Sequence, residues 1–279
     1  MELDEGDLNY YYDKKFFLNK NIIVTGATGG IGSCLVRTLT KLGAKIVAII
    51  KDEDKFNNMF NDILNEKNLS YEKIDFSKNL QQKEEYQKAI LKLDGKIDIL
   101  FLCHGKYNMS EIEATSYKEF DEILNINTRS YTSLISLSVP FLKLSKGNIV
   151  AVSSLESYIP IASGFLNTVT KSMVNELIQC SALELASFGI RVNGVAPGIT
   201  FTSHRVGINE DFQEDQNREY MEKMGTYNLL GENKVVQPTD IVNSMLFLAS
   251  EDAKFITGEI IKVDNGFSLN HDLNFSKLD

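Results

Sequence analysis

The feature that most constrains the fold is a regular alternation of two kinds of segment. Short apolar runs rich in β-branched residues are separated by longer segments whose apolar residues recur at helical spacing. Near-continuous apolar strands are typical of a parallel sheet covered by helices on both faces. The sequence therefore predicts an α/β fold, a single Rossmann-type, doubly wound parallel sheet of about seven strands flanked by helices. The predicted strands are 21–25, 44–50, 70–74, 97–103, 148–153, 190–196 and 259–263.

No Gly/Ser-rich or Pro-rich linker divides the chain, so one domain is expected over residues 20–268, with an irregular insertion at about 199–235. Residues 1–19 are predicted to be an N-terminal arm, and residues 269–279 a C-terminal tail. The aromatic cluster of the arm has two interpretations, packing on the domain or binding a partner.

Charge and composition narrow the functional classes. The chain has 38 acidic and 29 basic residues and a net charge of -9, so it offers no overall attraction to nucleic acid. No stretch reaches the roughly 20 apolar residues of a membrane span, and no secretory signal or Arg-rich transit peptide is visible. Three scattered cysteines and three scattered histidines predict neither a disulfide framework nor a metal site. A soluble protein of a reducing compartment is expected, the cytoplasm before the mitochondrial matrix.

The first chemical signal is TGATGGIG, residues 25–32, between the first predicted strand and the first predicted helix. Glycines at such a junction allow a tight turn and a close approach of backbone to a pyrophosphate. The helix N-terminus that follows directs N–H groups and a positive dipole at the anion. In this setting the motif predicts dinucleotide binding.

Several further motifs follow one another along the chain. With the glycine-rich turn they are TGxxxGxG at Thr25, Gly26, Gly30 and Gly32; IDF with Asp75; LNIN ending at Asn127; NIVAVSS ending at Ser154; RVNGVAPGITFT; and ITGEIIKVDNG. Through these motifs, which occur in the family's order, the chain resembles the short-chain dehydrogenase/reductase family from about residue 20 to 268.

The resemblance implies a set of NAD(P)(H)-binding residues. Asp75 would bond the adenine, Lys171 the nicotinamide ribose, and Thr202 the carboxamide. The whole set implied for the cofactor is Thr25, Gly26, Thr28, Gly30, Ile31, Gly32, Lys51, Asp75, Gly105, Lys171, Pro197, Gly198 and Thr202.

The end of the second strand bears on the choice between NAD and NADP. NAD enzymes usually place an acidic residue there to accept from the ribose 2′-OH, whereas a basic residue favours a 2′-phosphate. Here Ile50 takes the acidic position and Lys51 follows it. This favours NADP(H) weakly, because Asp52 and Glu53 come next and Lys51 could equally be a surface charge.

The catalytic positions implied by the resemblance are matched only in part. Asn127, Ser154 and Lys171 match the family's Asn, Ser and Lys, but the position of its Tyr, four residues before Lys171, is Asn167. Lys171 is expected to open the helix that follows, KSMVNELIQCSALELASFGIRVN. An amide donates hydrogen bonds but cannot release a proton near neutral pH. Loss of a positioned acid typically lowers a rate by a factor of roughly 10² to 10⁴.

Two nearby residues could change this account. Tyr158, four residues after Ser154, could supply the missing phenol from a loop. His104 is a titratable candidate near the cofactor or simply a histidine in a strand-end turn. Its neighbour Cys103 replaces an Asn that braces the sheet in the family.

Three functions follow from these observations. The first is an NAD(P)(H)-binding homologue with a degenerate active site, impaired or non-catalytic. The second is an active NADPH-dependent carbonyl reductase or alcohol dehydrogenase that uses Tyr158, a water relay, or Asn167 as a donor only. The third is a structural or regulatory subunit of a larger assembly. A homo-oligomer formed through the helices after Asn127 and Lys171 is also implied by the family.

Overall fold

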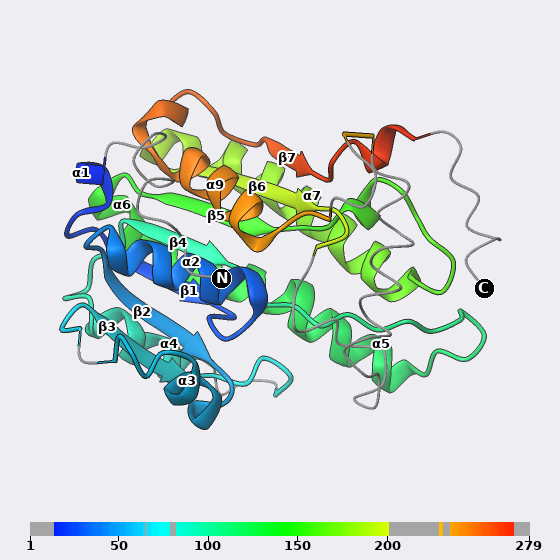
Figure 1. Cartoon of the computed structure of the whole chain (residues 1–279), viewed down its shortest axis with the longest axis horizontal. Coiled ribbons are helices and arrows are strands. Elements are labelled where there is room, and N and C mark those ends of the chain that lie inside the picture. Colours follow the sequence, from blue (N-terminus) through cyan, green and yellow to red (C-terminus); the bar gives the residue numbers. More distant parts are fainter. Residues whose placement is uncertain (1–13, 65, 79–81, 201–228, 231–234, 271–279) are drawn as a thin grey trace.

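The computed structural model describes residues 14–64, 66–78, 82–200, 229–230 and 235–270. Its centre is a seven-stranded sheet in the order β3-β2-β1-β4-β5-β6-β7, in which every neighbouring pair is parallel (Figure 1). The predicted fold class is confirmed, and each predicted strand overlaps an observed one. The strands are β1 Asn21–Thr25, β2 Lys45–Ile50, β3 Leu69–Lys73, β4 Ile99–Leu102, β5 Asn148–Val152, β6 Arg191–Pro197 and β7 Ile260–Val263.

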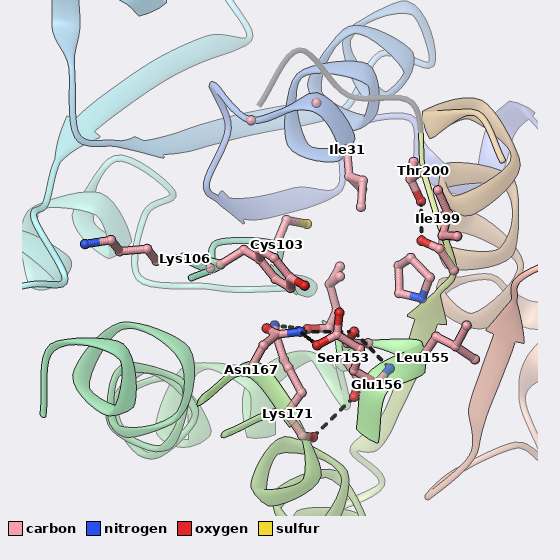
Figure 2. A pocket seen from close by; sticks show the side chains of 18 of the residues that line it. Ile31, Cys103, Lys106, Ser153, Leu155, Glu156, Asn167, Lys171, Ile199 and Thr200 are labelled. Carbon is pink, nitrogen blue, oxygen red and sulfur yellow. Dashed lines mark hydrogen bonds between the residues drawn. The ribbon is translucent and has the colours of Figure 1, made fainter. Parts of the chain in front are cut away.

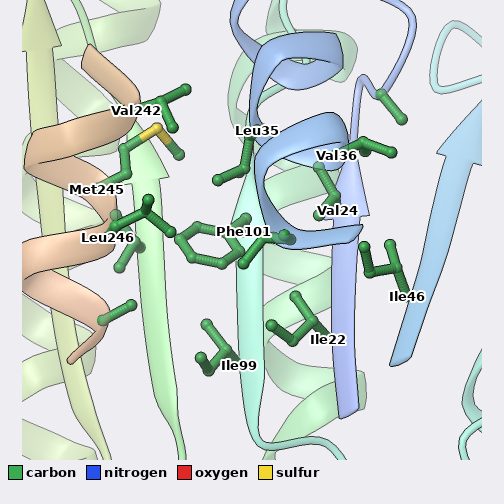
Figure 3. Packing of buried hydrophobic residues seen from close by; sticks show 14 of the residues in the cluster. Ile22, Val24, Leu35, Val36, Ile46, Ile99, Phe101, Val242, Met245 and Leu246 are labelled. Carbon is green, nitrogen blue, oxygen red and sulfur yellow. The ribbon is translucent and has the colours of Figure 1, made fainter. Parts of the chain in front are cut away.

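One face of the sheet packs against α2 (Gly30–Lys41) and α9 (Pro238–Ala249), which lie in front of it in Figure 1. Side chains alternate between the two faces of a strand, so Ile22 and Val24 of β1 point to this layer while Ile23 points away. Figure 3 shows the residues of the two helices meeting the strands around the fully buried Phe101.

The opposite face is covered by α4 (Gln82–Leu91), α6 (Ser130–Ser145) and α7 (Phe165–Leu185). Their buried anchors include Tyr86 and Tyr131, which meet strand residues such as Ile23 and Leu100 in a second apolar cluster. Because an apolar layer of this kind covers each face of the sheet, the strands are apolar along most of their length.

Shorter elements complete the described chain. They are α1 Lys14–Phe17, α3 Glu53–Met59, α5 Tyr117–Leu124, the π-helix η2 Asn125–Arg129, and the 3₁₀ turns η3 Leu155–Ser157, η4 Ala186–Phe188, η5 Glu251–Ala253 and η6 Phe267–Leu269.

Helix α7 corrects one detail of the sequence prediction. A helix was expected to open at Lys171, but it begins at Phe165, six residues earlier. Lys171 therefore lies in the second turn, where its side chain is fixed by the turns on either side.

The proposed arm, insertion and tail are described only in part. Phe17, at the end of α1, is fully buried in the core, so this part of the arm packs on the domain. Residues 1–13, 201–228, 231–234 and 271–279 lie outside the described residues. Among the described residues, no helix has the length and apolar character that a membrane crossing requires.

Strand order determines where a site can form. In the sheet, β1 lies between β2 and β4. The chain fills the sheet on the β2 side first and then crosses to the β4 side. Connections leave the sheet in opposite directions at this point, and a crevice opens beyond the carboxyl ends of the strands.

Candidate functional site

A cavity of about 330 Å³ lies at the carboxyl ends of β1, β4, β5 and β6 (Figure 2). It brings together the glycine-rich turn after β1, the loop after β4, the start of η3 and two residues of α7. The lining residues that matter below are Gly30, Ile31, Gly32, Cys103, His104, Gly105, Lys106, Ser154, Glu156, Asn167, Lys171, Pro197, Gly198 and Phe267.

The glycine-rich turn has no room for a side chain at Gly26 or Gly32. Gly26 has a φ of +63°, and a Cβ there would come within 2.6 Å of the His104 Cα. A Cβ on Gly32 would lie 2.2 Å from the Gly26 carbonyl oxygen. The N-cap of α2, Gly29, makes no side-chain capping bond, so the N–H groups of the first turn remain for a ligand in the cavity. This backbone cradle fits a pyrophosphate.

Thr25 and His104 form a buried brace behind that turn. The Thr25 hydroxyl lies 2.6 Å from His104 Nδ1, and the Ser130 hydroxyl lies 2.6 Å from Nε2. Burial lowers the pKa of His104 well below its ordinary value, and the nearby charge of Lys171 lowers the pKa further. The ring is therefore neutral. Because Ser130 donates to the Ile126 carbonyl, its oxygen accepts from Nε2–H, and Nδ1 accepts from Thr25. His104 thus joins β1 to α6.

Lys51 and Asp75 meet at the ends of β2 and β3. The Lys51 Nζ lies 3.7 Å from Asp75 Oδ2, while Asp75 Oδ1 accepts from the backbone N–H and hydroxyl of Ser77. The Lys51 side chain is 71% exposed, so its ammonium remains accessible to a ligand. A cation and a fixed carboxylate therefore stand together at this edge of the sheet.

Asn127 is fully buried in the π-helix η2. Its Oδ1 accepts from the Lys106 backbone N–H at 2.8 Å, and its Nδ2 donates to the Lys106 carbonyl at 3.0 Å and to the Thr170 hydroxyl at 3.2 Å. A Cβ on Gly105 would lie 3.5 Å from both Asn127 Oδ1 and Lys171 Nζ. Asn127 therefore holds the loop after β4 against α7.

The Lys171 ammonium is buried at the floor of the cavity. Its Nζ donates to the Val152 carbonyl at 2.7 Å, and the side chain is only 6% exposed. Burial lowers the pKa of Lys171 from 10.5 to about 8, with a smaller opposing effect of Cys103.

Glu156 and Asn167 lie together near Lys171 (Figure 2), and hydrogen bonds connect both of them to Ser154. The Asn167 Nδ2 donates to Glu156 Oε2 at 2.8 Å and contacts Ser154 Oγ at 3.4 Å. Ser154 Oγ also accepts from the backbone N–H of Glu156 at 3.2 Å. Both amide hydrogens of Asn167 are therefore directed at neighbouring side chains.

On the far side of the cavity, Pro197 and Gly198 line the wall at the end of β6. Gly198 packs so closely on Asp264 that a Cβ would lie 2.8 Å from the Asp264 Cα. Thr200 donates to the Gly198 carbonyl at 2.9 Å and also lines the cavity. Thr202, predicted to hold a carboxamide, lies outside the described residues.

Some predicted residues do not reach the cavity. Tyr158 is 43% exposed and does not line it, and its ring instead lies 5.3 Å from the Lys262 ammonium. The Thr25 side chain is fully buried behind the turn, and Thr28 does not line the cavity either. Among the described residues, no cluster of three or more His, Cys, Asp or Glu side chains could hold a metal ion.

Glu156, like Lys106, is one of the lining residues that the sequence argument missed. Its signal was its place, two residues after Ser154 in the loop that follows a central strand, where a carboxylate is aimed at the same crevice as Ser154.

Comparison with known proteins supports the same family along the chain. The family model described as "Enoyl-(Acyl carrier protein) reductase" matches residues 26–268. A tropinone reductase homologue of Arabidopsis thaliana is 32% identical over 261 residues, covering 92% of this chain and 96% of the relative. A 7alpha-hydroxysteroid dehydrogenase of Clostridium sardiniense is 31% identical over 258 residues, covering 90% and 94%.

Solved structures share the fold. Ligand-free aldohexose dehydrogenase of Thermoplasma acidophilum is similar with a TM-score of 0.80 and 24% identity, over 93% of this chain and 98% of that one. A short-chain dehydrogenase/reductase of unknown function from Caenorhabditis elegans, solved with cofactor, gives a TM-score of 0.82 and 24% identity, over 94% and 99%.

The parallel sheet, the glycine cradle at its switch point and a family match over nearly the whole described domain agree with one another. This chain belongs to the short-chain dehydrogenase/reductase family, whose fold binds NAD(P)(H).

Proposed function

We propose that the protein is an NAD(P)(H)-binding short-chain dehydrogenase/reductase with a degenerate proton-transfer site, so that its redox turnover is impaired or absent. The observation that carries the proposal is the position of Asn167, whose amide lies next to Ser154 and one helical turn from Lys171. Bound NAD(P)(H) would supply or accept the hydride, and the protein would have to supply or accept the proton.

Asn167 cannot perform that proton transfer. An amide does not ionise near neutral pH, and both of its hydrogens are directed at Ser154 and Glu156. The second point also weighs against Asn167 as a hydrogen-bond donor to a substrate carbonyl. Tyr158 lies outside the cavity lining, which weighs against it as a relocated acid.

The dinucleotide half of the site has the features that binding needs. The turn from Gly26 to Gly32 leaves backbone N–H groups at the cavity, and Asp75 is fixed by Ser77 at the end of β3. Lys51 is exposed at the end of β2, which favours the 2′-phosphate of NADP(H). Binding would therefore persist where proton transfer does not.

The first test of this function is a fluorescence titration of the purified full chain with NADPH and NADH. Saturable binding of either dinucleotide is expected, with NADPH tighter. Absence of saturable binding of both would remove the proposal and favour a structural or regulatory subunit.

The second test restores the phenol. Asn167→Tyr is expected to raise turnover of a panel of ketones and aldehydes by roughly 10²- to 10⁴-fold over the wild type, because a phenol beside Lys171 can donate the proton. Asn167→Phe is the matched control, since it adds the ring without the hydroxyl and should give no gain. Wild-type turnover equal to that of the Asn167→Tyr variant would show that the site is not degenerate.

A further inference from the structure

Lys171 is a buried ammonium whose hydrogen-bond partner is a neutral carbonyl. Its Nζ donates to the Val152 oxygen at 2.7 Å, and the side chain is 6% exposed. Within the described ranges of the chain, no Asp or Glu forms an ion pair with Lys171. The Tyr131 ring, with its centroid 5.3 Å from Nζ, attracts a cation more weakly than a carboxylate would. The ammonium therefore loses hydration without gaining a counter-charge from the part of the chain that the structure describes.

The titratable neighbours of Lys171 do not supply that counter-charge either. Cys103 reaches the cavity from the loop after β4, whereas Lys171 reaches it from α7 (Figure 2). Burial raises the pKa of the Cys103 thiol, so the thiol stays neutral, and His104 is neutral as well. Because burial lowers the pKa of Lys171 to about 8, roughly a tenth of this side chain is a neutral amine at about pH 7.

The loop after β4 leaves one side of this amine open. Gly105 lines the cavity together with Lys171, and a Cβ on Gly105 would lie 3.5 Å from Nζ and 3.9 Å from Cε. Since glycine has no Cβ, the loop does not cover Nζ from this side. The wall of the same cavity includes the apolar side chains of Leu155, Ile159 and Ile161. A small apolar molecule can therefore bring a reactive carbon to the amine.

We propose that Lys171 is a nucleophile that captures a small apolar aldehyde as an imine. The reaction needs neither hydride transfer nor a dinucleotide, so it goes beyond the function proposed above. Desolvation in an apolar pocket is one of the ways in which proteins activate a lysine amine toward carbonyl compounds. Asn167 does not occupy the lone pair of the amine, because its Nδ2 is directed at Ser154 and Glu156.

The step exchanges a C=O bond for a C=N bond. The Nζ lone pair attacks the aldehyde carbon, and the π electrons of the carbonyl move to its oxygen. That oxygen then leaves as water with the two hydrogens of the neutral amine, so no oxidant or reductant is consumed. When the imine nitrogen takes a proton from solvent, it carries one N–H. This N–H can bond to the Val152 carbonyl as the amine does, so the product keeps the contact that fixes Nζ.

The test traps the imine in the full chain without dinucleotide. Hexanal is the probe, sodium cyanoborohydride reduces the C=N bond by supplying a hydride, and peptide mass mapping identifies the alkylated lysines. Lys106 is the internal reference, because it lines the same cavity while its ammonium pairs with Glu122 at 2.7 Å. At about pH 7 Lys171 is expected to be alkylated at least about tenfold faster than Lys106, since a larger fraction of its amine is neutral.

Lys171→Arg tests the residue itself. A guanidinium keeps the positive charge and can donate to the Val152 carbonyl, but it stays protonated and forms no imine. The fast alkylation should therefore disappear. Lys106→Arg is the matched control, since arginine can keep the pair with Glu122, and it should leave the rate at Lys171 unchanged. Thermal melting followed by circular dichroism checks that both variants are folded, and the wild-type map decides the question without either variant.

Two results would overturn the inference. One is alkylation of Lys171 that is no faster than that of Lys106, and the other is fast alkylation that persists in a folded Lys171→Arg variant. The dinucleotide titration is separate from both. A chain that forms the Lys171 adduct but binds neither NADPH nor NADH would contradict the proposed function alone. A chain that binds NADPH but forms no adduct at Lys171 would contradict this inference alone.

Discussion

At the scale of single residues, Lys171 carries a charge that its surroundings disfavour. Its Nζ is bonded to the Val152 carbonyl, and burial lowers its pKa to about 8. The folded protein therefore holds this proton less tightly than the unfolded chain, in which the pKa is near 10.5.

The stability of the protein should depend on pH through Lys171, and the effect is opposed by Cys103, Tyr86 and Tyr131, because burial raises the pKa of each of these three groups. Between about pH 8 and pH 10.5 the Lys171 side chain is protonated in the unfolded state and deprotonated in the folded state. The contribution of Lys171 to the free energy of unfolding therefore rises with pH across this window, and this gain is lost as pH falls through 8. The full effect is roughly 3 kcal/mol. Urea unfolding across this range is expected to give a free energy of unfolding whose slope against pH is more positive in the wild type than in Lys171→Met. Equal slopes in the two proteins would contradict the assignment.

Lys51 provides the residue-scale test of cofactor choice. Lys51→Glu is expected to weaken NADPH binding by about tenfold, because a charge-assisted contact to the 2′-phosphate becomes a repulsion, and to leave NADH binding nearly unchanged. Lys45→Glu reverses the same charge at the opposite end of β2, where Lys45 pairs with Asp94, and should change neither affinity. Fluorescence titration of both variants measures the difference. Parallel loss of NADPH and NADH affinity would assign Lys51 no role in choosing between them.

Residue positions were predictable where backbone geometry dictates them. Gly30 and Gly32 line the cavity because the tight βα turn places the start of α2 there. The sequence could not show that Tyr158 would turn out toward Lys262, or that Glu156 would turn in toward Asn167. Side chains of a short loop are oriented by long-range packing, which local patterns do not encode.

At the scale of elements, the contact between the glycine turn and the start of α2 is the tightest in the site. Gly32 approaches the Gly26 carbonyl so closely that α2 can begin directly beneath the turn. This closeness brings the helix N-terminus to the cavity.

Gly32→Ala should break that arrangement. A Cβ 2.2 Å from the Gly26 oxygen forces the turn and helix apart, which is expected to lower the free energy of unfolding by about 1–3 kcal/mol and NADPH affinity by at least tenfold. Ser33→Ala, the next residue of α2, is the control, because within the described parts of the chain its hydroxyl bonds only to the Gly30 carbonyl. Urea unfolding and NADPH titration check the two effects. Normal NADPH binding by the Gly32→Ala variant would show that the cradle is not the binding site.

The early start of α7 shows a limit of reading elements from sequence. The segment 165–170 has no side-chain cap, and its N-cap is Gly164, so no local signal marks the boundary. Leu166 and Thr170 are buried, and their packing extends the helix toward the cavity. Tertiary packing rather than intrinsic helix propensity therefore sets the start of α7.

At the scale of the whole molecule, the parallel sheet could be foreseen because each apolar strand was followed by an amphipathic segment. The side chains of β1 divide between the two core layers, as a doubly wound sheet requires. Ile22 and Val24 pack in one layer and Ile23 packs in the other. The substrate end could not be foreseen in the same way, because residues 155–161 have no period to read.

An exposed apolar stripe along α7 supports the family-based expectation of a homo-oligomer. Val169, Met173 and Leu183 are exposed on one long helix, with Leu183 at 83%. Leu183→Glu is expected to shift the protein toward the monomer, because it would place a charge in the interface expected on this face of α7. Light scattering after size-exclusion chromatography measures the mass, and Leu91→Glu on α4 is the exposed control. A monomeric wild type would contradict the expectation.

The π-helix η2 has a consequence for how this chain tolerates insertions and deletions. A π-turn accommodates one residue more than an α-helical turn, and each residue of a helix advances its faces by about 100°. Deleting one residue between Asn125 and Arg129 would restore regular α-helical bonding and swing Ser130 and Tyr131 away from His104. The length of this segment is therefore fixed to the residue.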